Sequence, residues 1–266
     1  AVSSLQFGAV EKIRWSASDG LPIEGVLVKP TNYVAGERYP LVVEIHGGPQ
    51  WTWWYGWQCS WHEWAQLLAN NGFVVLLPNP RGSEGHGWRF ADKNFQDWGG
   101  NDFQDIMSGV DYLVEQGIAD PERMGIGGWS YGGYMTAWAV TQTNRFKAAV
   151  AGTALSDLTS FYGTTDIPTF MRANFDGNPY GLQEMYDTHS ALTFAKQIQT
   201  PTLILHGDAD TRVPLSQSHE LYQALRETGV ECRFVVYPRE PHSIGERAHQ
   251  LDVLERVLEW YVTHVR

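Results

Sequence analysis

The stretch GGWSYGG, residues 127–133, places one serine, Ser130, between two pairs of glycines. It follows a run that is typical of a buried strand, and residues 134–140 after it contain no Pro or Gly and are typical of a packed helix. Glycine is unfavourable in regular structure and is kept where φ is unusual or where backbones approach closely. The pattern therefore predicts a nucleophile elbow, a strained turn between strand and helix that holds a serine hydroxyl clear of the backbone. The flanking elements favour this interpretation over a glycine-rich turn with an incidental serine.

Short apolar segments alternate with helical stretches along most of the chain. This alternation predicts an α/β protein with a mainly parallel central sheet and helices on both faces, and the elbow makes it an α/β-hydrolase fold. A length of 266 residues suits one large core, so we expect residues 1–266 to form a single catalytic domain. The predicted elements are a hairpin over residues 12–29, strands at 40–45, 73–77, 124–128, 148–151, 202–205 and 233–237, and helices at 102–116 and 216–228.

The irregular segment of residues 153–186, rich in Thr, Gly, Pro and aromatic residues, follows one of the predicted strands. Loops at the carboxyl ends of parallel strands are where such sheets build binding sites. We therefore expect this segment to form a substrate pocket or cap.

Composition excludes several classes of protein. The chain is 43% hydrophobic and 18% charged, which is typical of a globular protein, and no apolar run approaches the length of a membrane span. The formal net charge is −11, without clusters of Lys and Arg that could meet a phosphate backbone. We expect neither a membrane nor a nucleic acid as a partner.

Targeting and cysteine signals are weak. Residues 1–15 lack a basic start followed by an apolar core, so no secretory signal is predicted, and we expect a cytoplasmic protein.

Cys59 and Cys232 are too few for a disulfide framework, and neither has metal-ligand spacing. They are interpreted as buried thiols, with a single bridge as the alternative.

A serine hydroxyl is a poor nucleophile unless an imidazole, itself oriented by a carboxylate, lies within hydrogen-bond reach. In this fold the acid and then the histidine follow the serine along the chain. Among nine histidines, His242 lies on a loop between the last predicted strand and the terminal helix, whereas the others have ordinary structural explanations. Asp208 and Asp210 both follow the strand at 202–205, and position alone does not separate them.

An acyl-transfer site also needs two amides directed at the oxyanion of the tetrahedral intermediate. The amide of Tyr131, directly after the serine, is one candidate. The loop HGGP, residues 46–49, follows an early strand, and this position favours an oxyanion loop over a plain Gly-Gly-Pro turn.

These motifs occur together with NPRGS (79–83), DWGGND (97–102), HGDADTRVP (206–214) and the late Pro241-His242. The set, in this order and over nearly the whole chain, resembles the catalytic domain of the prolyl oligopeptidase family, above all its acylaminoacyl-peptidase branch. The resemblance implies Ser130 as nucleophile, His242 as base, Asp210 as acid, and the amides of Gly48 and Tyr131 as the oxyanion hole. It further implies that the first specificity pocket is lined by Tyr131 together with Leu155, Leu158, Phe161 and Val213.

The activity implied is that of a serine peptidase or acyl-peptide hydrolase that forms an acyl-enzyme on Ser130. A carboxylesterase acting on short-chain esters with the same triad is the alternative, because esters need less protonation of the leaving group. Most family members carry an N-terminal β-propeller that screens substrates by size, and this sequence begins about where the propeller would end. Whether the chain stands alone or is excised from a longer protein is left open.

Two conspicuous features receive structural interpretations. Tryptophans crowd residues 51–64, and we expect them to wall the pocket or to form an interface, which makes a homo-oligomer possible. Asp97, Asp102 and Asp105 suit the capped start of a helix, so we expect no metal and no other cofactor. Arg81 is interpreted as the partner of a structural ion pair.

Overall fold

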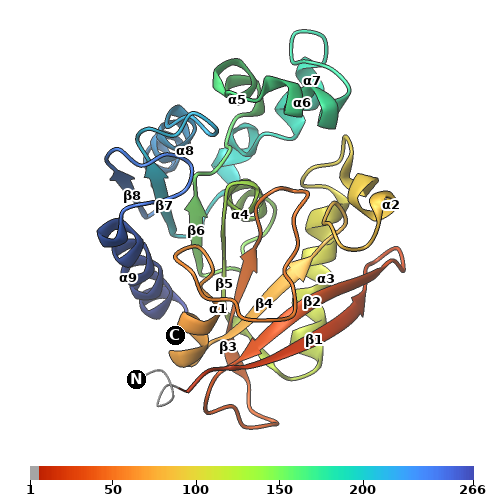
Figure 1. Cartoon of the computed structure of the whole chain (residues 1–266), viewed down its shortest axis with the longest axis vertical. Coiled ribbons are helices and arrows are strands. Elements are labelled where there is room, and N and C mark those ends of the chain that lie inside the picture. The colour runs from red at the N-terminus through yellow and green to blue at the C-terminus, as the bar shows by residue number, and fades with distance from the viewer. Residues whose placement is uncertain (1–5) are drawn as a thin grey trace.

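The computed structural model describes residues 6–266, which form an eight-stranded sheet flanked by helices (Figure 1). The first five residues, part of the stretch predicted to carry no secretory signal, lie outside the described residues. The strand order is β1-β2-β4-β3-β5-β6-β7-β8. The strands are β1 (Ala9–Ser16), β2 (Pro22–Lys29), β3 (Tyr39–Ile45), β4 (Val74–Asn79), β5 (Ala119–Trp129), β6 (Ala148–Gly152), β7 (Thr202–Gly207) and β8 (Cys232–Tyr237).

Pairing is parallel from β4 to β8, whereas β1 pairs antiparallel with β2 and β2 antiparallel with β4. Every residue of β3, β4, β6 and β7 is buried, as continuous apolar strands covered on both faces must be. β1 lies at the sheet edge and is mostly exposed. The predicted α/β-hydrolase class, with its mainly parallel sheet, is confirmed.

Helices cover both faces of the sheet and produce two hydrophobic cores. α3, α4 and α8 contribute to one core, and α1 and α9 contribute to the other. The helical elements are α1 (Ala65–Asn70), α2 (Trp88–Ala91), η2 (Asp92–Asn94), α3 (Asn101–Glu115), α4 (Tyr131–Gln142), α5 (Leu158–Thr164), α6 (Pro168–Phe175), α7 (Gln183–Thr188), η3 (Ala191–Gln197), α8 (Ser216–Glu227) and α9 (Arg247–His264).

The irregular segment at 153–186 forms the short helices α5 and α6 and the start of α7, which lie beyond one end of the sheet, at the top of Figure 1. This is the end at which the parallel strands β6 and β7 finish, so the segment lies where a pocket or cap was predicted. Among residues 6–266, no helix is both long and apolar enough to cross a membrane.

The two cysteines differ from prediction. Cys59 is exposed and Cys232 is half-buried, and both are free thiols. The prediction of buried thiols is wrong for Cys59, because it lies in the irregular segment that precedes α1, outside the cores. The alternative of a single bridge is wrong as well.

Candidate active site

Ser130 lies in the sharp turn that joins β5 to α4, with φ 62° and ψ −118°. This left-handed conformation is strained for a residue with a side chain. A Cβ on Gly128 or Gly132 would collide with the carbonyl oxygen of Ile45 on the neighbouring strand β3. The two glycines are thus required by close backbone approach, and they allow the turn to pack against β3 while the serine points outward.

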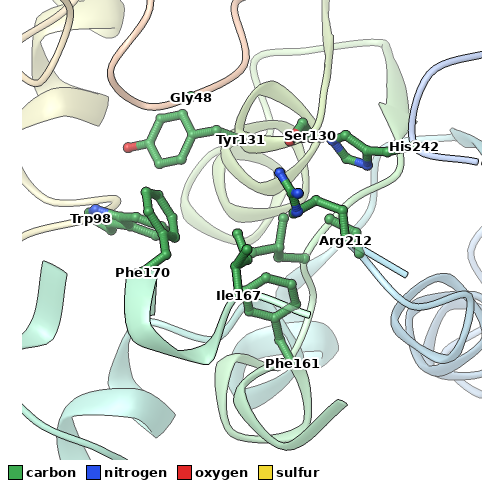
Figure 2. Close-up of a pocket in the computed structure, with 11 residues that line it drawn as sticks. Gly48, Trp98, Ser130, Tyr131, Phe161, Ile167, Phe170, Arg212 and His242 are labelled. Atoms are coloured by element: carbon green, nitrogen blue, oxygen red, sulfur yellow. Dashed lines mark hydrogen bonds between the residues drawn. The ribbon is translucent and has the colours of Figure 1, made fainter. Parts of the chain in front are cut away.

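Ser130, His242 and Asp210 form one hydrogen-bonded chain at the carboxyl ends of the strands. His242 Nε2 lies 3.0 Å from Ser130 Oγ, and His242 Nδ1 lies 2.8 Å from Asp210 Oδ2. Figure 2 shows the His242 ring beside the Ser130 side chain. The three residues come from separate loops, after β5, β7 and β8, and the fold brings them together.

Asp210 is held rigidly. Its side chain is fully buried, and its Oδ1 accepts hydrogen bonds from the amides of Arg212 and Val213, each at 2.9 Å. His206 lies beneath it, with Nε2 2.8 Å from the Val213 carbonyl oxygen, and burial lowers the pKa of His206 to about 4. His206 is therefore a neutral imidazole: it holds the loop through Val213 and forms no ion pair with the Asp210 carboxylate.

His46, in the HGGP loop, has a comparable structural role. Its Nε2 lies 2.8 Å from Ser83 Oγ, and burial lowers its pKa to about 4. The structural interpretations of His46 and His206 agree with this geometry.

A pocket of about 360 Å³ opens beside Ser130 (Figure 2). Its walls are mostly apolar and come from both the elbow and the irregular segment. It is lined by Gly48, Trp98, Ser130, Tyr131, Leu155, Phe161, Ile167, Phe170, Arg212, Val213 and His242.

The pocket brings together most residues predicted for it. Leu155, Phe161 and Val213 line it, as does Tyr131. Leu158 does not: it is fully buried at the start of α5, in the core. The prediction for Leu158 therefore needs correction: at the first turn of α5 its side chain is enclosed by the core, and within the described residues Phe161, one turn later, is the α5 residue that reaches the pocket.

Sequence reasoning missed four residues of the pocket: Trp98, Ile167, Phe170 and Arg212. Trp98 lies in the motif DWGGND and Arg212 in HGDADTRVP, so their membership of these motifs could have indicated a place at the site. Ile167 and Phe170 lie in the irregular segment, whose course no pattern specified. The Arg212 side chain is 46% exposed and forms an ion pair with Asp166, with Nε 2.7 Å from Oδ1, so it brings a charged group to a mostly apolar wall.

Gly48 and Tyr131, the predicted oxyanion residues, both line the pocket next to Ser130. Within residues 6–266, neither amide donates a hydrogen bond to another residue. Tyr131 is the first residue of α4, where free amides and the helix dipole favour an anion.

The loop that carries His242 is fixed from two sides. The buried carboxylate of Glu240 accepts from the amides of Gly245 and Glu246, and Trp129 Nε1 donates to the His242 carbonyl oxygen at 2.9 Å. Glu240 also bonds His249 Nδ1 at 2.7 Å. With Glu246 these two form a group of metal-ligand spacing, yet loop amides and His249 already satisfy the Glu240 oxygens.

The tryptophan-rich segment does not wall the pocket. None of residues 51–64 is among the residues that line it. Trp53 and Trp64 are buried in the second core, whereas Trp51, Trp54 and Trp57 are about half exposed. Of the two predicted roles, the pocket wall is wrong, and the interface is untested.

The sheet, the elbow and the Ser130–His242–Asp210 chain define an α/β-hydrolase domain of the serine-hydrolase type. The chain belongs to the prolyl oligopeptidase family, whose model matches residues 57–266. The predicted family resemblance is therefore confirmed.

Three relatives show the extent of the similarity. The uncharacterized peptidase YuxL of Bacillus subtilis is 37% identical over 260 residues, covering 96% of this chain and 39% of that protein. The acylaminoacyl peptidase of Pyrococcus horikoshii superimposes with a TM-score of 0.92 at 31% identity, covering 99% of this chain and 43% of that one. An acylaminoacyl peptidase in complex with Z-Gly-Gly-Phe-chloromethyl ketone gives a TM-score of 0.91 at 32% identity, with the same coverage. The chain thus spans about two fifths of the length of these relatives.

Proposed function

We propose that residues 1–266 form one catalytic domain that hydrolyses peptides or acyl-peptides through an acyl-enzyme on Ser130. The observation that carries the proposal is the hydrogen-bonded chain from Ser130 Oγ through His242 to the buried Asp210, at the mouth of an apolar pocket. Membership of the prolyl oligopeptidase family supports it.

In the proposed mechanism, Ser130 Oγ attacks the scissile carbonyl carbon while His242 Nε2 takes the hydroxyl proton. The amides of Gly48 and Tyr131 stabilise the oxyanion. His242 then returns the proton to the leaving amine as the C–N bond breaks, and the acyl group stays on Ser130. A water molecule, deprotonated by His242, attacks this ester and releases the acid. Asp210 holds Nδ1–H so that Nε2 faces the serine.

The acyl side of the substrate is proposed to be bulky and apolar. Leu155, Phe161 and Val213 join the Tyr131 ring around a pocket large enough for an aromatic side chain. The relative solved with a phenylalanine chloromethyl ketone supports this preference. Arg212, at the rim, is placed to donate to a carbonyl oxygen of a peptide.

The test compares N-acetyl-phenylalanine p-nitroanilide with the corresponding p-nitrophenyl ester, and repeats both with lysine in place of phenylalanine. We expect turnover of amide and ester, a preference of about tenfold or more for phenylalanine, and none with Ser130→Ala. Ester turnover with no amide turnover would favour the carboxylesterase alternative. Turnover retained by Ser130→Ala would exclude the mechanism.

Location and assembly are part of the proposal. Two free thiols suit a reducing compartment, which supports a cytoplasmic chain. The exposed side chains of Trp51, Trp54 and Trp57 support burial against another copy of the chain. The net charge of −11 speaks against nucleic acid as a partner.

A further inference from the structure

Tyr131 connects the proposed site to a buried carboxylate. Its ring lines the pocket and packs edge-on against Trp98, with centroids 5.0 Å apart. Its hydroxyl, at the far end of the ring, donates to Asp102 Oδ2, and both residues are buried. Asp102 itself is not among the residues that line the pocket. The ring is thus fixed at one end by the elbow and at the other by Asp102.

Asp102 differs from the other buried carboxylate of α3. Asp105, one turn further along, is neutralised by Arg81, whose Nε and Nη2 donate at 2.8 and 2.7 Å. Asp102 has no such cation among the described residues: Oδ1 accepts the amide of Phe103 at 2.7 Å, and Oδ2 accepts Tyr131. An ion pair therefore explains Asp105, whereas the pairing of Asp102 serves the Tyr131 side chain.

A third buried side chain, that of Asn94, lies beside the hydrogen bond between Tyr131 and Asp102. The side-chain amide of Asn94 lies next to the Tyr131 hydroxyl, and its Nδ2 has no hydrogen-bond partner in the described part of the chain. Asn94 is almost fully buried, and its Nδ2 can donate to the Tyr131 hydroxyl but cannot accept a hydrogen bond from it. Asp102 is then the one acceptor that this hydroxyl reaches within residues 6–266.

We propose that Asp102 is a positioning residue for acyl-group specificity, because it fixes through the Tyr131 hydroxyl the ring that walls the pocket beside Ser130. The inference rests on the proposed function. It concerns the fit of large acyl groups more than the chemical step, because the main chain of Tyr131 is already held by α4.

The protonation of Asp102 provides a readout that simple packing would not give. Burial, with Asp97 and Asp105 adding to it, raises the pKa of Asp102 to about 7. From α4 it is faced by the hydroxyls of Tyr131 and Tyr134, whose own pKa values burial raises well above the ordinary value for tyrosine. As the pH rises through 7, a neutral acceptor becomes a carboxylate that binds the Tyr131 hydroxyl more strongly. The Tyr131 ring, which forms this wall of the pocket, should then be held more firmly.

The experiment measures kcat/KM for N-acetyl-phenylalanine p-nitrophenyl ester divided by kcat/KM for p-nitrophenyl acetate, from pH 6 to 8. His242 acts on both esters, so its ionisation cancels in this ratio. We expect the wild-type ratio to rise about threefold with pH. It should stay flat in Asp102→Asn, which keeps an acceptor but does not titrate, and it should fall about tenfold in Asp102→Leu, which has none.

Tyr131→Phe gives a second route to the same answer if Asp102→Leu does not fold, and its ratio should also fall and lose its pH dependence. The matched control is Tyr237→Phe, which removes a comparable tyrosine–aspartate bond, from Tyr237 to Asp252 at 3.0 Å, away from the pocket. Its ratio should match the wild type at each pH. Ratios for Asp102→Leu and Tyr131→Phe equal to that of the wild type at every pH would overturn the inference. Absence of any ester turnover in the wild type would instead reject the proposed function.

Discussion

Two regions of the molecule are equally conspicuous in the sequence, and the structure treats them in opposite ways. The strand-end loops that carry Ser130, His242 and Asp210 are bound by hydrogen bonds to each other and to neighbouring main chain. The aromatic loop, residues 51–57, exposes 49% of Trp51, 46% of Trp54 and 54% of Trp57.

The difference lies in how each side chain is held. Among the tryptophans of the aromatic loop, Trp53 alone has an indole nitrogen that donates a hydrogen bond within residues 6–266, at 3.1 Å to the Glu44 carbonyl oxygen, and its amide lies 2.7 Å from Asn79 Oδ1. At the strand ends, each polar side chain contacts a residue from a different loop. Abundant aromatic residues therefore do not define the site, whereas convergent hydrogen bonds between distant segments do.

The largest expected effect contrasts two carboxylates within one loop. Asp210→Asn should lower kcat by about 10⁴, as loss of the orienting acid does in serine proteases, because the imidazole tautomer is no longer fixed. Asp208 is exposed and accepts the amide of Arg239, so Asp208→Asn should cost less than about threefold. Steady-state kinetics with one ester compares the two. Similar losses of kcat in the two variants would show that Asp210 is not the residue that orients His242.

The elbow should tolerate no side chain at its glycines. Gly132→Ala should destabilise the fold by at least about 3 kcal/mol, because the new methyl group meets the Ile45 carbonyl. Gly163, in α5, is the control: nothing lies within 4 Å of its added Cβ, and Gly163→Ala should change stability by less than about 1 kcal/mol. Urea unfolding measures both. Equal stabilities would contradict the close packing of the elbow against β3.

Glu44, on β3, accepts a hydrogen bond from the Trp53 indole nitrogen of the aromatic loop with its carbonyl oxygen, and its effect on stability depends on pH. Its Oε1 accepts the Trp64 amide, its Oε2 has no partner in the described part of the chain, and burial raises its pKa to about 8. The unfolded chain ionises Glu44 near 4.5, so unfolding releases a proton between 4.5 and 8, and stability falls as pH rises through that window.

Glu44→Gln removes this titration. At pH 8 the variant should be more stable than the wild type by about 2 kcal/mol or more, and at pH 4 the two should be close. Thermal unfolding at both pH values measures the difference. A constant difference between the two pH values would show that Glu44 is not held protonated.

The smallest effect on catalysis is expected in the aromatic loop. Trp54→Ser combined with Trp57→Ser should change kcat/KM for the phenylalanine ester by less than about twofold, since neither residue lines the pocket. Self-association should weaken in the same variant, because the exposed apolar area is removed. Light scattering reports the second result. A large loss of activity in a monomer would place this loop in the site.

How much of the structure could be predicted depends on whether a feature is determined by local sequence or by contacts with distant segments. Glycine spacing and strand periodicity are local, so they predicted the elbow and the mainly parallel sheet. Asp208 and Asp210 are equivalent in local sequence, so the family resemblance rather than position chose Asp210, and in the structure its contact with His242 distinguishes it. Ile167 and Phe170 lie in an irregular segment whose path depends on tertiary packing. For Leu158, the family resemblance predicted a place in the pocket, whereas tertiary packing encloses the side chain in the core.

The central claim, an acyl-enzyme on Ser130, is tested most directly by covalent labelling. The wild type, Asp210→Asn and Ser130→Ala are treated with a fluorophosphonate, and the modified peptide is identified by mass spectrometry. The account predicts one adduct, on Ser130 in the wild type, a much slower adduct at the same residue in Asp210→Asn, and none in Ser130→Ala. An adduct on another residue, or equal labelling of Ser130→Ala, would contradict it.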